Sequence, residues 1–264
     1  MLTAIFFVTA IILMGLLGPL ISTADPIRID AANRLKPPSL AHPFGTDIMG
    51  RDVLARVMYG TRTSLTVGVI AAAAALVLGL VIGLVAGYFR WLDAIVMRIM
   101  DAIMAIPTIV LAVALVAIAG ANLFTVLVAI VVPEFPRVVR LVRGVILGLR
   151  SEPFVEAAVS LATPNWRILL RHMLPNTLAP LIVQGSFILA SAILTEAVLS
   201  FLGVGLPPEI PSWGNVIAEG RSYFQLFPGL VFFPGLFLAA TVLAINLIGD
   251  ALRDALDPKL ARRG

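Results

Sequence analysis

Few residues of this 264-residue chain carry the side chains that catalysis or metal binding requires. There is no cysteine, and the two histidines, His42 and His172, lie in distant parts of the sequence, so no metal site and no disulfide is expected. The only lysines, Lys36 and Lys259, follow leucine and proline, so the phosphate-binding loop G-x-x-x-x-G-K-[ST] is absent. Neither an H-E-x-x-H zinc motif nor a G-x-S-x-G elbow around Ser186 is present. We therefore expect no ATPase or other enzymatic activity and no cofactor.

Polar residues inside apolar stretches are the remaining candidates, because a membrane makes such residues costly and they usually serve a function. Asp101 and Glu134 lie near the ends of their stretches, where pairing with the arginine three residues before or after is the simpler role. Glu196 lies in the middle of its stretch, and two interpretations stay open: it lines a central pathway, or it contacts Asn246. Asp101, Glu196 and Asn246 are therefore the candidate pathway residues.

Composition indicates an all-α, polytopic membrane protein. The chain is 60% hydrophobic and 13% charged, with a mean hydropathy of +1.03, far above that of soluble domains. The net charge of +4 comes from arginines and lysines that flank apolar spans, where they set orientation, so no nucleic-acid binding is expected.

The N-terminal part is predicted to hold one span and an outer segment. Residues 1–21 form the first transmembrane helix, since a cleaved signal peptide would need a basic start and a small-residue cleavage site. Residues 22–64 form an extracytoplasmic segment, in which 46–58 are predicted to be a short interfacial helix with the pairs Asp47–Arg51 and Asp52–Arg56. A solvated helix without a partner is the alternative.

Residues 65–264 are predicted to form a core of five further spans. They cover 65–88, 97–119 with a kink at Pro107, 123–149 interrupted at 133–136, 178–204 and 229–249. Small residues recur every fourth position of the second span and predict either a packing seam inside the chain or a subunit interface: Ala71, Ala75, Gly79, Gly83 and Gly87. The arginines and lysines place the 151–176 loop and both termini in the cytoplasm.

Residues 151–176 are the only long polar stretch between two strongly apolar blocks. Ser151 is expected to cap a first helix that runs to Ala162, and Thr163 a second helix over 165–173 that ends before Leu174-Pro175. The result would be a helical elbow suited to insertion into a groove on another protein, with an ordinary connecting loop as the alternative.

The elbow resembles the EAA motif of ABC importer permeases. The matching residues are Phe154, Glu156, Ala157, Ala158, Ala162, Pro164, His172, Leu174 and Pro175. Two positions depart from the family pattern: Ala162 replaces a glycine, and His172 replaces a branched aliphatic residue, although peptide permeases often have histidine there. Because alanine resists the left-handed turn that glycine permits, the hinge is expected to be more helical than in the family.

Three other stretches resemble the second permease of dipeptide and oligopeptide importers. They are FGTDIMGRDV at 44–53, LSFLGVG with PSWG within 199–214, and NLIGDALRDALDP at 246–258. The resemblance implies a type I importer permease that forms half of a heterodimeric pore, with two ATP-binding subunits, an extracytoplasmic substrate-binding protein and a peptide substrate, in a bacterial inner membrane. It implies ATPase coupling through the elbow and suggests partner contacts at Asp47, Arg51, Asp52 and Trp213. A self-contained secondary transporter or channel is the alternative.

Overall fold

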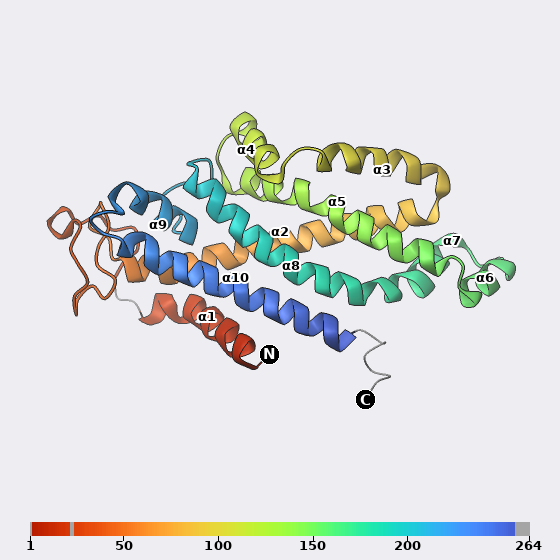
Figure 1. Ribbon diagram of the computed structural model, residues 1–264, viewed down its shortest axis with the longest axis horizontal. Coiled ribbons are helices and arrows are strands. Elements are labelled where there is room, and N and C mark those ends of the chain that lie inside the picture. Colours follow the sequence, from red (N-terminus) through yellow and green to blue (C-terminus); the bar gives the residue numbers. More distant parts are fainter. Residues whose placement is uncertain (1, 22–23, 257–264) are drawn as a thin grey trace.

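The computed structural model describes residues 2–21 and 24–256 (Figure 1). In these ranges the chain consists of helices and loops, and it contains no strand. The only β-type pairing there is an isolated bridge between Thr46 and Asp52. The all-α prediction is therefore confirmed. The long helices lie roughly along one direction, with the 151–176 elbow at one end and α9 and the 24–52 segment at the other (Figure 1). We call these the elbow end and the α9 end.

The first two long helices are α1 (Leu2–Ile21) and α2 (Val53–Tyr88), with the one-turn η1 (Ala31–Asn33) between them. α2 begins at Val53 because the Asp52 carboxylate caps it, accepting a hydrogen bond from the Ala55 N–H at 2.7 Å. It then continues for 36 residues without a break. The separate interfacial helix predicted over 46–58 is therefore wrong, because residues 46–52 form a loop and 53–58 are the first turns of α2.

Pro107 breaks its span instead of kinking it. α3 (Arg90–Met104) and α4 (Thr108–Ala119) are separate helices whose axes differ by 87°. Proline has no N–H and disfavours helical conformation in the residue before it, so the chain turns at Ala105 and Ile106, and Pro107 becomes the N-cap of α4.

In contrast, α5 (Leu123–Leu149) passes through Pro133 and Pro136 as one helix of 27 residues. The interruption predicted at 133–136 is wrong. Both prolines and Glu134 are buried against neighbouring helices, so tertiary packing holds the helix where its own hydrogen bonds are missing.

The second half of the elbow is continuous with the next span. α6 (Pro153–Ser160) is followed by α7 (Asn165–Arg167), a π-helical turn η2 (Ile168–Met173) and α8 (Leu174–Phe201), which together make one helical run of 37 residues from Asn165. The predicted stop before Leu174-Pro175 is wrong. The Leu174 N–H bonds to the Leu169 carbonyl five residues back, and this wider turn lets the helix continue through Pro175.

The 202–228 connection contains α9 (Trp213–Gly220) and the short η3 (Arg221–Tyr223), and α10 (Gly229–Leu256) runs back toward the elbow end. Three helical runs of the described chain are long and apolar enough to cross a membrane: Val53–Tyr88, Asn165–Phe201 and Gly229–Leu256. The bent α3–α4 pair would be a fourth. Two further helices, α1 with 20 residues and α5 with 27, complete the set of long helices, and the count of six spans stays a prediction.

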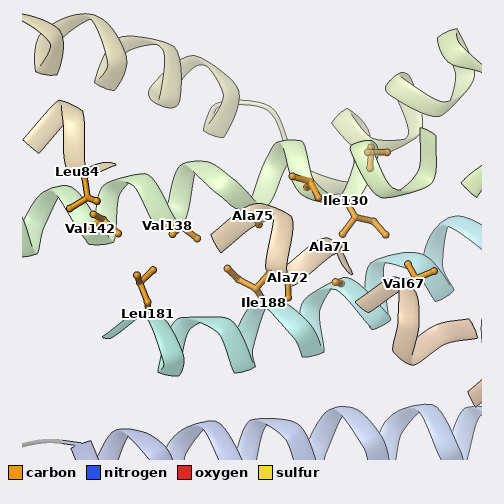
Figure 2. Packing of buried hydrophobic residues seen from close by; sticks show 14 of the residues in the cluster. Val67, Ala71, Ala72, Ala75, Leu84, Ile130, Val138, Val142, Leu181 and Ile188 are labelled. Carbon is orange, nitrogen blue, oxygen red and sulfur yellow. The ribbon is translucent and has the colours of Figure 1, made fainter. Parts of the chain in front are cut away.

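α2 packs most extensively against α5 and also against α8, and the main core lies among these three helices and α4 (Figure 2). The small residues of α2 form the seam with α5. A β-carbon on Gly79 would lie 2.3 Å from the Val138 Cβ, and one on Gly87 would lie 2.8 Å from the Ile146 Cβ. The stripe is therefore a packing seam inside the chain, where glycine lets two backbones approach closely.

Candidate functional site

The first helix of the elbow, α6, is held to the bundle by one face only. Val155 and Ala158 are buried, whereas Phe154, Glu156 and Ala157 are exposed. The predicted cap is wrong in detail: Glu152 occupies the N-cap position, and the Ser151 hydroxyl instead donates to the Gly148 carbonyl at 3.1 Å. Glu156 makes no ion pair within the described ranges, and it lines a groove that also contains Arg90 and Arg150.

Ala162 ends α6 in the left-handed conformation, with φ of +53°. The Ala162 N–H bonds to the Val159 carbonyl at 2.9 Å, and the Thr163 N–H bonds to the Ala158 carbonyl at 3.1 Å. These two bonds form a Schellman motif, in which the left-handed position usually holds glycine. The prediction of a more helical hinge is therefore wrong, because alanine adopts the turn of the family glycine.

The second helix begins at Asn165, as predicted, but its cap is a different residue. Pro164 is the N-cap of α7, with extended backbone, and its carbonyl accepts the Arg167 N–H at 2.9 Å, so Thr163 is not the cap. The break at Thr163-Pro164 itself is confirmed. Tyr88 at the end of α2 fixes this corner, since its hydroxyl donates to the Asn165 side-chain oxygen at 2.8 Å.

The elbow displays an apolar surface that the motif alone did not identify. Leu161 is 81% exposed and Trp166 is 59% exposed, and Phe154, Val159 and Leu170 are exposed beside them in sequence. The Phe154 ring lies 6.4 Å from the half-buried His172 ring, across the two arms of the elbow. Leu174 is half-buried and Pro175 exposed. The sequence signal for this surface was the presence of large apolar side chains in an otherwise polar stretch. Exposed apolar surfaces of this kind mark protein–protein contacts.

A buried ion network lies at the α9 end. The Asp47 carboxylate accepts hydrogen bonds from Arg51 Nε at 2.7 Å and Arg56 Nη1 at 2.8 Å, and both arginines also contact Glu219 of α9. The predicted Asp47–Arg51 pair is confirmed. The predicted Asp52–Arg56 pair is wrong, because Asp52 caps α2 and bonds to His42 Nδ1 at 2.8 Å. Glu219 was missed, since no local spacing links it to Arg56.

The residues predicted to contact partners outside the membrane are all buried. Asp47, Arg51 and Asp52 are each less than 9% exposed, and Trp213 is completely buried. The Trp213 indole N–H donates to the Val57 carbonyl at 3.2 Å. These side chains hold the 24–52 segment and α9 on the bundle, and a contact between this region and another protein stays a prediction.

The three candidate pathway residues do not form one cluster. Asp101 of α3 pairs with Arg140 of α5 at 2.8 Å, in an exposed position, and not with Arg98. Asn246 is half-buried in α10. Glu196 is completely buried and bonds to three serines instead of Asn246, so of its two interpretations the Asn246 contact is wrong and the pathway role stays a prediction. The Glu134–Arg137 pair, at 3.1 Å, is confirmed.

Known proteins match nearly the whole chain. It is 53% identical over 251 residues to a probable peptide ABC transporter permease protein, y4tQ, of Sinorhizobium fredii, covering 95% of this chain and 86% of that protein. It is 44% identical to the dipeptide transport system permease protein DppC of Alkalihalophilus pseudofirmus, covering 97% and 84%, and 36% identical to the oligopeptide transport system permease protein OppC of Bacillus subtilis, covering 98% and 85%.

The fold also has a solved counterpart. A chain of the MetNI methionine ABC transporter, in an inward-facing conformation, superposes with a TM-score of 0.58 at 20% identity, covering 76% of this chain and 96% of that one. The family model of the binding-protein-dependent transport system inner membrane component matches residues 75–262, which include the elbow, α8 and α10. The chain belongs to this family of transport-system membrane components.

Proposed function

We propose that the chain is a permease subunit of an ATP-driven peptide importer in a bacterial inner membrane. It forms half of the translocation pathway beside a second, different permease. Two separate ATP-binding subunits hydrolyse ATP, and an extracytoplasmic binding protein delivers the substrate. The elbow end and both termini lie in the cytoplasm, and the α9 end faces outward.

The elbow is the observation that carries this proposal. It projects from the end of the bundle and exposes an acidic residue, Glu156, next to small and large apolar side chains. A projection of this kind fits a groove on another protein, where apolar residues supply contact area and one charge fixes the register. Peptides are the substrate class that the names of the relatives favour.

The continuity of α7 and α8 supports a mechanism for coupling. When ATP binding closes the two ATPase subunits, each seated elbow moves with its subunit. Because the second half of the elbow and α8 form one helical run, that motion tilts a helix that reaches the opposite side of the bundle. The half-pathways then alternate between inward-open and outward-open states.

Glu156→Lys tests the proposal in the assembled transporter in proteoliposomes. We expect the variant to insert normally but to lose peptide uptake and to co-purify less with the ATPase subunits. Glu209→Lys is the matched control, since Glu209 is also exposed but lies at the α9 end, 53 positions along the chain from Glu156. Unchanged uptake and co-purification in Glu156→Lys would defeat the proposal.

A further inference from the structure

Glu196 lies at the junction of three helices, where a charge is least expected. Its side chain is completely buried in the last turns of α8, and within the described chain no cationic group pairs with it. Its partners are three hydroxyls: Ser200 at 2.8 Å, Ser212 at 2.9 Å and Ser64 at 3.4 Å. A buried carboxylate without a cation is costly unless hydrogen bonds satisfy it, so this arrangement requires α2, α8 and α9 to stay together.

Each serine is directed toward Glu196 by a second bond. The Ser212 hydroxyl oxygen accepts the Asn215 N–H at 3.1 Å as the N-cap of α9, and the Ser64 oxygen accepts the Trp213 N–H at 3.3 Å. The Ser200 oxygen accepts the Leu206 N–H at 3.4 Å. Because these oxygens already accept, their hydrogens are available to the carboxylate.

The first turn of α9 is wedged between the two long helices. A β-carbon on Gly214 would lie 2.6 Å from the Ala197 Cα of α8, and one on Gly60 of α2 would lie 3.1 Å from the Ser212 carbonyl carbon. α9 therefore contacts backbone on both sides, and the contact leaves no room for it to shift while the Glu196 bonds persist. The far end of α9 carries Glu219, which contacts Arg51 and Arg56.

Glu196 and the second half of the elbow belong to the same helical run. The run Asn165–Phe201 has 37 residues, which corresponds to roughly 55 Å at the helical rise of 1.5 Å per residue. That length exceeds the thickness of a bilayer core, about 30 Å. Glu196 lies five residues before the end of this run at Phe201, so its cluster is at the opposite end of the helix from the elbow.

We propose that Glu196 is a positioning residue that latches α9, through Ser212 and Ser64, to the helix that begins in the elbow. This latch transmits motion between the elbow and the α9 end. The inference rests on the proposed function and deepens it, because it names the contact through which α9 and the 24–52 segment communicate with the ATPase subunits. Breaking the latch uncouples the two ends without removing either one.

The test uses the complete transporter in proteoliposomes and measures ATPase activity with and without the binding protein. Glu196→Ala is expected to keep basal ATPase activity. Its stimulation by the binding protein should fall at least about fivefold, the lower range of typical coupling between sites. The double variant Ser64→Ala/Ser212→Ala keeps the carboxylate and is expected to behave likewise, which covers the case that Glu196→Ala does not fold. Glu196→Gln should restore part of the stimulation, since its amide oxygen still accepts hydrogen bonds.

Ser186→Ala is the matched control, because Ser186 is on the same helix but its hydroxyl bonds to its own helix at the Val183 carbonyl. It should leave stimulation unchanged. A second readout is the distance between spin labels at Ala218 of α9 and the exposed Ile182 of α8. The labels are simple to introduce because the sequence has no cysteine. Glu196→Ala should broaden this distance distribution, and Ser186→Ala should not.

The outcomes separate the two claims. Full stimulation and an unbroadened distance in both latch variants would overturn the latch while leaving the proposed function intact. A wild-type complex that the binding protein does not stimulate would overturn the proposed function, and the latch with it.

Discussion

Gly83 of α2 and Val142 of α5 approach so closely that a β-carbon on Gly83 would lie 2.7 Å from the Val142 Cβ. The same β-carbon would lie 2.9 Å from the Val139 carbonyl oxygen, which belongs to backbone and cannot rotate away. The contact between these helices, the most extensive in the chain, therefore depends on hydrogen as the side chain at this position.

The first prediction concerns this seam. Gly83→Ala should destabilise the folded protein by about 1–3 kcal/mol, because the methyl group forces α2 and α5 apart. Gly144→Ala is the same change on α5, where a β-carbon would meet no atom within 4 Å, and it should be neutral or stabilise by up to about 1 kcal/mol. Thermal unfolding in detergent distinguishes them, and equal melting temperatures would contradict the close contact.

The seam also shows what the sequence could predict. Small residues at every fourth position are read directly from the chain, and they predicted a packing face on the second span. The sequence could not tell that α5 was the partner, since a seam inside the chain and a subunit interface have the same pattern. Tertiary packing likewise kept α5 helical through Pro133 and Pro136, where local rules predicted a break.

The candidate site was predictable to a similar degree. Motif spacing located the elbow and Glu156, because these depend on residues close together in sequence. The Glu196 cluster and the Glu219 contacts join residues from α2, α8 and α9, and no local period connects such distant positions. Whether an acid pairs with the arginine three positions away or with one on another helix is decided by packing, as Asp101 shows by pairing with Arg140 and not with Arg98.

The second prediction concerns the left-handed residue of the elbow. Ala162→Gly should stabilise the elbow by roughly 1 kcal/mol, since the left-handed conformation costs alanine about that amount and glycine almost nothing. Ala157→Gly, within α6, should instead destabilise it by about 0.5–1 kcal/mol. Hydrogen exchange of the Thr163 amide, which bonds to the Ala158 carbonyl, should slow in the first variant and quicken in the second. Faster exchange in Ala162→Gly would contradict the assigned turn.

The third prediction compares a buried and an exposed ion pair. Glu219→Ala leaves Arg51 and Arg56, both at most 5% exposed, short of an acidic partner and should cost about 3–5 kcal/mol. Asp101→Ala breaks a pair whose two side chains are about half exposed and should cost no more than about 1 kcal/mol. Thermal unfolding measures both losses of stability. A Glu219→Ala variant as stable as Asp101→Ala would show that Glu219 does not stabilise the buried arginines.

The seating of the elbow in a separate ATPase subunit can be tested directly by cross-linking. Because the chain has no cysteine, single cysteines can be placed without background. Ala157→Cys puts one on the exposed face of α6, and Leu40→Cys puts one on a fully exposed residue of the 24–52 segment at the α9 end. With a short bifunctional reagent on the assembled transporter, we expect position 157 to cross-link to an ATPase subunit and position 40 not to. A cross-link to the ATPase from position 40, with none from position 157, would contradict the account.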